Sequence, residues 1–342
     1  MSIRRITALK GLLALLGVLA GLGYGLPATA ADAAVTKIEL WPDAALAGSP
    51  VRGPERVGRD GKGVGAYANI SRPRIEIYRP AKPNGTAVLI DGGGGYFRIQ
   101  IGNESIPTAQ WLQQLGVTAV VLYYRLPVDG WPPAATFADG QRAMRILRAR
   151  AGEFGINPQQ IGVIGMSAGG NLAAITATRY ADPFYEPVDA IDQVSARPDF
   201  AGLIYPVISL QAPLDTTRSK RELSTQKDAV QAYSAELHVT HDTPPTFLAQ
   251  AADDPIANIG HSLVMFNALK AASVPVEMHV FENGGHGWGL GTPGTQVAQW
   301  PRLFATWARS HGFMAGQGYG TTFFVKPAAG DKAAPERVRE DD

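Results

Sequence analysis

The chain has 342 residues and not one of them is cysteine. That absence excludes disulfide bonds, thiolate metal ligands and a cysteine nucleophile. Histidines with the H-x-x-x-H spacing of a zinc-binding helix are missing too, so the sequence predicts neither a metal site nor a cofactor.

An excess of one charge is also missing. The chain carries 31 Lys and Arg residues against 30 Asp and Glu residues, a formal net charge of +1. A nucleic acid or an anionic membrane surface is therefore not an expected partner. With 45% hydrophobic and 18% charged residues, the composition is that of a soluble globular protein with a sizeable core. Large α/β domains often run past 200 residues as one unit, so we expect one large domain. No internal repeat is visible.

An apolar, uncharged run covers residues 11–26 and follows a short basic segment, residues 4–10. Ala28-Thr29-Ala30 completes the small-x-small pattern of a cleavage site. The run is too short and too rich in glycine for a membrane anchor, so we expect residues 1–30 to be a signal peptide. The mature protein is then secreted or periplasmic, without stable insertion in a membrane. The Arg4-Arg5 pair leaves the twin-arginine route open.

Beyond this leader, short apolar runs alternate with helical patterns over residues 31–325. Nearly continuous apolar runs suit strands that are buried on both faces of a parallel sheet. Strand–helix alternation predicts an α/β fold, a doubly wound and mostly parallel sheet with helices on both faces. The expected strands are Lys37–Trp41, Arg74–Tyr78 (half-exposed), Ala87–Ile90, Val117–Tyr123, Ile161–Ile164, Phe200–Ile204, Thr246–Gln250 and Val276–Phe281, and the expected helices are Thr108–Leu115, Phe137–Phe154, Asn171–Tyr180, Ile259–Ala271 and Val297–Ser310.

Three segments interrupt this alternation. Residues 43–66 are rich in glycine, proline and charge, and we expect a loop there. Residues 209–243 are polar and weakly periodic, and they lie between two expected strands. That is where lids and substrate-binding loops usually occur, so we expect one of the two. The tail, residues 326–342, is charged and lacks an apolar face, which predicts disorder.

A candidate nucleophile lies in Gly165-Met166-Ser167-Ala168-Gly169, which fits the pattern G-x-S-x-G. Five-residue patterns recur by chance. Here the pattern follows one expected strand directly and precedes an expected helix, which is the strand–turn–helix context of a nucleophile elbow. The N-terminus of that helix would face the position where negative charge develops. This context favours Ser167 as the nucleophile.

A serine hydroxyl needs a base to take its proton. His286 lies on a glycine-rich loop downstream of the serine, whereas the other five histidines occupy strand, helix or polar-loop positions. The acid of such a site follows a late strand, between the serine and the histidine. Asp253 and Asp254 both meet that condition. We choose Asp254, because it stands directly before the turn proline, and interpret Asp253 as a turn or capping residue.

Four glycines in a row, Gly92–Gly95, follow the expected strand Ala87–Ile90. Residues without side chains let backbone N–H groups approach a substrate oxygen closely. We expect the oxyanion hole to be formed by Gly93, Gly94 and the amide of Ala168. A phosphate-binding loop is the alternative, but no Gly-Lys-Ser/Thr follows and the dinucleotide motif is only partly met.

These motifs resemble those of the α/β-hydrolase esterases, in the group of acetyl xylan esterases, feruloyl esterase-like proteins and dienelactone hydrolases. The resemblance runs from about Leu40 to Phe313. Related proteins usually have proline where this chain has Gly92, and often a Val-Pro-Val type stretch where it has Ile256-Ala257-Asn258; both departures would reshape the mouth of the site. The resemblance is carried by Gly93–Tyr96, Tyr124–Pro127, Gly165–Gly169, Tyr205-Pro206, Asp253–Pro255 and Gly284–Gly287.

The resemblance implies an esterase that removes small acyl groups, above all acetyl, from plant polysaccharides or oligosaccharides. The expected partner is therefore a small-molecule or carbohydrate ester. Tyr96, Trp288 and Trp131 are candidates for an aromatic substrate platform, with packing in the core as an equal alternative. A general short-chain carboxylesterase and a peptidase of the same fold are the other enzyme hypotheses. A binding protein without activity is disfavoured, because the chain keeps serine, acid and histidine.

Overall fold

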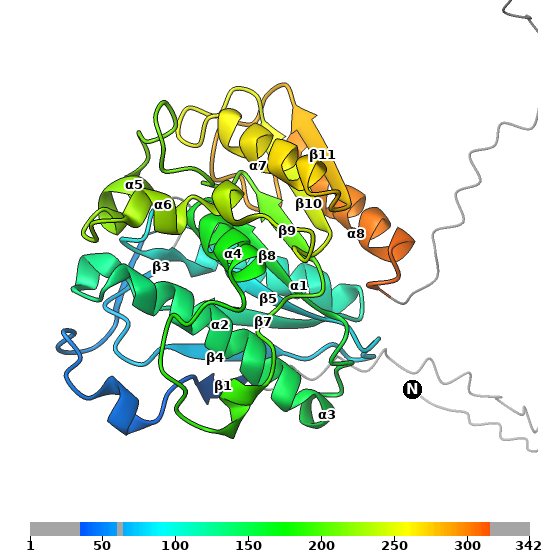
Figure 1. The fold of residues 1–342 in the computed structure, drawn as a ribbon. Coiled ribbons are helices and arrows are strands. Elements are labelled where there is room, and N and C mark those ends of the chain that lie inside the picture. The colour runs from blue at the N-terminus through cyan, green and yellow to red at the C-terminus, as the bar shows by residue number, and fades with distance from the viewer. Residues whose placement is uncertain (1–34, 60–63, 315–342) are drawn as a thin grey trace, which may run out of the picture. The chain divides into compact units, whose positions relative to one another are not determined.

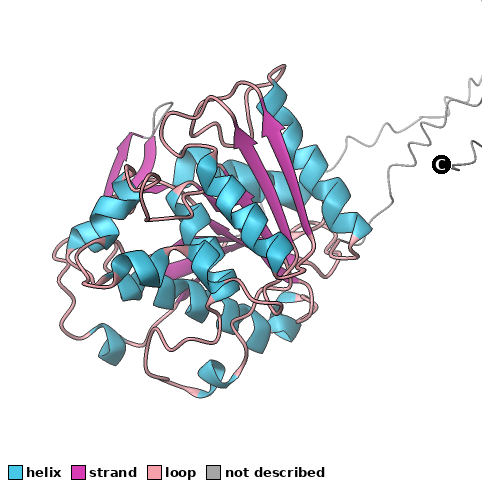
Figure 2. Ribbon diagram, turned by 45° about the horizontal axis from the view of Figure 1, so that its top comes forward, coloured by secondary structure: helices cyan, strands magenta, loops and turns pink. Residues whose placement is uncertain are grey.

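The computed structural model describes residues 35–59 and 64–314, so the predicted signal peptide and the predicted tail lie outside the described residues. An eight-stranded sheet has the order β1-β4-β7-β5-β8-β9-β10-β11 (Figures 1 and 2). The first two pairings in this order are antiparallel and the others are parallel. The strands are β1 (Thr36–Glu39), β4 (Arg74–Tyr78), β5 (Ala87–Asp91), β7 (Thr118–Tyr123), β8 (Ile161–Met166), β9 (Ala201–Ile204), β10 (Thr246–Ala251) and β11 (Val276–Phe281).

Helices cover both faces of this sheet. In Figure 1, α2, α4 and α7 lie in front of the strands, and α1 lies behind them. The first and last helices share the rear face, because the rings of Trp111 in α1 and Trp300 in α8 lie 5.4 Å apart. The helices are α1 (Ile106–Gln114), α2 (Pro133–Ala149), α3 (Ala151–Phe154), α4 (Ala168–Thr178), α5 (Arg218–Leu223), α6 (Ala229–Tyr233), α7 (Gly260–Ala271) and α8 (Trp300–Ser310).

The predicted fold class is confirmed. Strands β5, β7, β8, β9 and β10 are buried at every residue, because their aliphatic side chains meet helices on both faces of the sheet. The helix expected over residues 137–154 is two helices, α2 and α3, since Arg150 between them leaves helical geometry with φ −107° and ψ 21°.

The expected loop over residues 43–66 is wrong in part. A second, antiparallel sheet has the order β2-β3-β6, with β2 at Arg56–Arg59, β3 at Val64–Ala68 and β6 at Ile99–Gln100. Every residue of β2 is exposed, so no alternation of apolar and polar side chains marks the strand in the sequence. Its pairing with β3 forms it instead.

The expectation of a half-exposed strand at β4 is also wrong. Its central residue Glu76 is buried although its side chain is charged. The carboxylate is stabilised there by Arg74, with Nε and Oε1 3.2 Å apart, and by the hydroxyl of Tyr123, which donates to Oε2 at 3.2 Å. Because these partners satisfy the carboxylate, Glu76 can be buried within the sheet.

Parallel strands β5, β8, β9, β10 and β11 all end at the same edge of the sheet. The chain directly after each of them carries, respectively, Gly92–Gly95, Ser167, Tyr205, Asp254 and His286. Sites in open parallel sheets form at this carboxyl edge, because the loops that follow the strands converge there. The polar segment 209–243 follows β9 and contains α5, α6 and a 3-10 turn at Ala235–His238. In the described residues, no helix is long and apolar enough to cross a membrane.

Candidate active site

Ser167 lies on a sharp turn between β8 and α4. Its φ of 54° and ψ of −118° place a residue with a side chain in a strained region of backbone space. Two glycines make the turn possible: a Cβ at Gly165 would lie 2.1 Å from the carbonyl oxygen of Gly169, and a Cβ at Gly169 would lie 2.0 Å from that of Asp91. The amide of Val207 donates to the Ser167 carbonyl at 2.9 Å and holds the turn against the loop after β9. This geometry places the seryl oxygen at the carboxyl edge of the sheet, where Ser167 is 8% exposed.

The side chain of Ser167 lies in a chain of two short hydrogen bonds. Its Oγ is 2.7 Å from Nε2 of His286, and Nδ1 of the same ring is 2.7 Å from Oδ2 of Asp254. Because a carboxylate only accepts, Nδ1 carries the ring proton and donates it to Asp254. The unprotonated Nε2 is then left to accept from the serine hydroxyl. The structure thus brings together the three side chains selected from the sequence.

Asp254 and Asp253 have different neighbours, although they are adjacent in the chain. The carboxylate of Asp254 is fully buried and also accepts from the backbone amides of Ile256 and Ala257, at 2.8 and 2.9 Å, and from the side-chain amide of Gln250 at 3.0 Å. Three neutral donors thus fix the orientation of the carboxylate beside the imidazole.

Asp253 instead supports the loop that carries the histidine. Its Oδ1 accepts from the amides of Gly284 and Gly285, both at 2.8 Å. The residue is exposed and its carboxylate has no hydrogen bond to His286 among the described contacts. The two adjacent acids therefore have different roles: Asp254 contacts the imidazole, and Asp253 fixes the backbone of the loop.

The glycine loop differs from the prediction at Gly93. The amide of this residue donates to Oε2 of Glu104 at 2.6 Å, which contradicts its expected role as an oxyanion donor. Gly94 and Gly95 line the cavity beside Ser167. Ala168 is the first residue of α4, so its amide has no acceptor within the helix. Gly94 and Ala168 therefore stay as the candidate donors.

Glu104 links the glycine loop to the loop of His286. The carboxylate is buried in a π-helical turn, Ile101–Ser105, a kind of irregularity that is frequent at functional sites. The hydroxyl of Tyr205 donates to Glu104 Oε1 at 3.1 Å and accepts from the amide of Gly289 at 3.0 Å. Burial raises the pKa of Tyr205 well above its ordinary value, so the hydroxyl stays a donor. No motif marks Glu104 in the sequence, because its partners Gly93 and Tyr205 come from two other segments of the chain.

Substitution of Glu104 should damage turnover more than substrate binding. Glu104→Ala frees the Gly93 amide and loosens the neighbouring donor of Gly94, and a small misplacement of a catalytic group costs roughly 100-fold in rate. We expect kcat to fall by about that factor with KM changed less than about threefold. Glu104→Gln retains an acceptor for Gly93 and should restore most of the loss. Steady-state kinetics of both variants measure this, and an unchanged kcat in Glu104→Ala would argue against a positioning role.

A cavity of about 590 Å³ opens beside Ser167 and His286. Trp288 lines it, as the sequence suggested for a substrate contact, and its ring meets that of Tyr205 edge-on at 4.4 Å. The expectation for Tyr96 is wrong: its ring is fully buried and its hydroxyl donates to Asn171 at 2.9 Å. Trp131 also lies outside the cavity lining, with the Arg125 guanidinium 4.9 Å from its ring centre. Of the three aromatic candidates, Trp288 alone adjoins the site.

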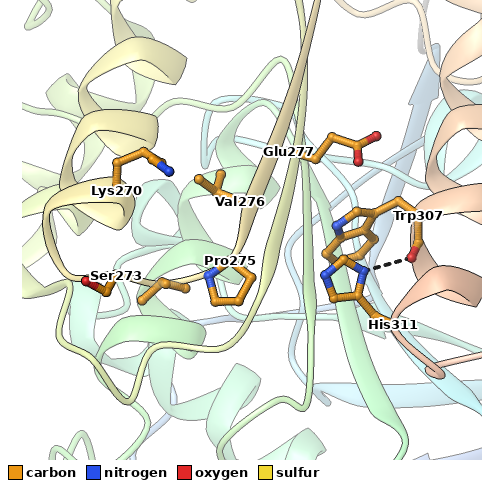
Figure 3. A pocket seen from close by; sticks show the side chains of 8 residues that line it. Lys270, Ser273, Pro275, Val276, Glu277, Trp307 and His311 are labelled. Carbon is orange, nitrogen blue, oxygen red and sulfur yellow. Dashed lines mark hydrogen bonds between the residues drawn. The ribbon is translucent and has the colours of Figure 1, made fainter. Parts of the chain in front are cut away.

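Other titratable groups of the described residues do not assemble a second site of this kind. His261 is buried, and its Nδ1 accepts from the amides of Ile208 and Ser209; burial lowers its pKa to about 4. Another hollow, which shares no lining residue with the cavity beside Ser167, lies between α7, β11 and α8, with His311 packed 4.9 Å from the ring of Trp307 (Figure 3). No group of three or more His, Asp or Glu side chains in the described ranges is arranged to hold a metal ion.

Comparison with known proteins places this geometry in a family. Residues 92–290 match the model of a family described as alpha/beta hydrolase fold. The chain belongs to this family. Its solved relatives include an acetyl ester-xyloside bifunctional hydrolase from Caldicellulosiruptor lactoaceticus, at 33% identity and a TM-score of 0.69, with 82% of this chain and 97% of that one covered. A thermophilic esterase from Thermogutta terrifontis with propionate bound matches at 25% identity and a TM-score of 0.63, over 79% and 98% of the two chains.

Curated relatives of this family member include an acetylxylan esterase from Xylanibacter ruminicola. The two are 29% identical over 229 residues, which are 65% of this chain and 45% of the relative. The endo-1,4-beta-xylanase B of Butyrivibrio fibrisolvens is 28% identical over 58% of this chain and 32% of its own length. The chain thus spans less than half the length of these curated relatives.

Proposed function

We propose that the protein is a serine carboxylic-ester hydrolase that works through an acyl-enzyme intermediate. The observation that carries the proposal is the hydrogen-bonded sequence Ser167 Oγ, His286 Nε2, His286 Nδ1 and Asp254 Oδ2, with both heavy-atom distances at 2.7 Å. A serine held on a strained turn next to an oriented imidazole is the arrangement that nucleophilic acyl transfer requires.

In this mechanism His286 Nε2 takes the proton of Ser167 as Oγ attacks the ester carbonyl. The carbonyl oxygen gains negative charge, which the amides of Ala168 and Gly94 stabilise together with the N-terminus of α4. The imidazolium, supported by Asp254, then gives its proton to the departing alcohol, and the acyl group stays on Ser167. Water attacks this acyl-enzyme in the second half-reaction, with His286 again as the base.

We further propose that the natural substrates are short acyl esters of plant polysaccharides or oligosaccharides, above all acetyl esters, and that the protein is secreted. Three lines support this choice: the predicted signal peptide, the acetyl ester-xyloside hydrolase among the solved relatives and the acetylxylan esterase among the curated ones. A general short-chain carboxylesterase is the second candidate, favoured by the exposed Ile256 at the cavity wall, which offers an apolar contact to any small alcohol.

Activity should peak at acyl chains of roughly two to four carbons. The cavity holds only about 590 Å³, and polar side chains such as Gln100, Asn103 and Thr217 interrupt its wall, whereas each methylene gains its burial energy of about 0.8 kcal/mol only against an apolar surface. Longer chains would therefore bind without further gain and soon exceed the space. Rates on a series of p-nitrophenyl esters measure the profile. A maximum at about eight carbons or more would contradict the proposed acyl site.

A further inference from the structure

Two guanidinium groups lie on the wall of the cavity that contains Ser167. Arg98 belongs to the loop after β5, and Arg218 is the first residue of α5. Their guanidinium carbons lie 4.9 and 4.5 Å from the centre of the same ring, that of Phe97. This ring therefore holds two cations beside the scissile position, with the stem of Arg218 packed against Gly95.

The positive charge of this wall is balanced only in part by neighbouring carboxylates. Arg218 donates through Nε to Glu222 on the next helical turn. Arg98 forms no ion pair with a described carboxylate, and its Nε is buried without a hydrogen-bond partner among the described residues. The acidic side chain on the same wall, Glu104, already accepts from Gly93 and Tyr205. A partly desolvated guanidinium favours an anionic partner, and a carboxylate matches its paired N–H donors.

The basic surface continues out of the cavity along α5. A second hollow of about 410 Å³ shares Thr217 and Arg218 with the first and is lined further by Lys220 and Arg221. Its one acidic lining residue is Asp215. Basic side chains thus line both the cavity beside Ser167 and the adjoining hollow, which together offer a path for a chain-like alcohol portion of a substrate.

We propose that the natural substrate is an acylated carbohydrate chain that carries carboxylates, such as a chain of uronic-acid residues. Arg98 and Arg218 bind the carboxylate nearest the scissile ester, and Lys220 and Arg221 bind the one that follows. The charge lies on the alcohol portion rather than on the acyl group, because the second hollow offers room for a long chain. The inference rests on the proposed esterase function and specifies its substrate class.

A matched pair of polymers tests the substrate class. Acetate release is measured from acetylated polygalacturonate and from the same polymer after methyl esterification of its carboxylates, with the full-length protein. We expect kcat/KM to be about tenfold higher on the free-acid polymer, the usual order for a charged hydrogen bond. This advantage should disappear when ionic strength rises from about 0.01 to about 1 M, because the Debye length falls from about 30 to about 3 Å.

Variants that remove one positive charge each test which residues cause the preference for the free-acid polymer. Arg98→Met and Arg218→Met keep an aliphatic stem over Phe97 and should each reduce the ratio of the two kcat/KM values by at least about threefold. Arg302→Met removes an equal charge from the exposed surface of α8, outside both hollows, and should leave the ratio unchanged.

Two results would overturn the inference. The first is an equal or higher kcat/KM of the wild-type protein on the methyl-esterified polymer, which requires no variant to fold. The second is an equal loss on both polymers in the arginine variants, which would mean that the guanidinium groups act on the oxyanion or on the fold. Failure of the esterase proposal itself is distinct, since neither polymer nor p-nitrophenyl acetate would then release acetate.

Discussion

Replacement of Ser167 by alanine is expected to lower kcat on p-nitrophenyl acetate by about 10⁴- to 10⁶-fold. Without Oγ no acyl-enzyme can form, and the rate that is left comes from binding and from the amides of the oxyanion hole alone. The fold should persist, because the turn is held by backbone hydrogen bonds such as Val207 N–H to the Ser167 carbonyl. Steady-state hydrolysis and a thermal melt of the same preparation measure both effects.

Ser219→Ala is the matched control for this variant. Ser219 lines the same cavity but has no hydrogen bond to His286 among the described contacts, so its replacement should change kcat by less than about threefold. A folded Ser167→Ala protein with nearly normal turnover would remove Ser167 from the mechanism.

Asp254→Asn is expected to lower kcat by roughly 10⁴-fold, whereas Asp253→Asn should cost less than about tenfold. Replacement of the Asp254 carboxylate by an amide removes the negative charge that supports the imidazolium. The N–H₂ group of the asparagine can also donate to Nδ1 and so favour the tautomer with the proton on Nε2, which cannot accept from the serine. At Asp253 the asparagine oxygen can still accept from the amides of Gly284 and Gly285, so the histidine loop keeps its support.

The two asparagine variants decide between the adjacent acids under identical conditions. They change the same charge by the same amount, so a difference in kcat reports position and not net charge. If Asp253→Asn proves the more damaging change, the contact between His286 Nδ1 and Asp254 does not carry the support of the imidazolium.

Most of the sheet could be predicted because its strands are apolar on both faces. Such runs differ from the polar connections, and the five fully buried strands, β5, β7, β8, β9 and β10, begin within one residue of their predicted starts. The small sheet could not be predicted, since β2 has no buried side chain to create a pattern and depends on pairing with β3. Backbone pairing between distant segments leaves no periodic signal in a single sequence.

The candidate nucleophile, base and acid could be selected because each follows a strand of recognisable pattern and the loops of parallel strands meet. The direction of a backbone N–H could not be selected in the same way. Gly93 and Gly94 are the same residue type in the same glycine run. The amide of Gly93 nevertheless donates to Glu104, whereas Gly94 lines the cavity. Tyr96 shows the same limit for side chains, because its ring turns into the core at φ 63°.

The most direct test of the proposed mechanism is to locate the activated serine by covalent labelling. A fluorophosphonate reacts with serines whose hydroxyl is activated by a neighbouring base, and it stays attached as an analogue of the tetrahedral intermediate. After brief treatment of the wild-type protein, peptide mass spectrometry should find one label per chain, on Ser167, with a parallel loss of esterase activity; His286→Ala should strongly slow the labelling. Label on another residue, or loss of activity without modification of Ser167, would contradict the assignment of Ser167 as the nucleophile.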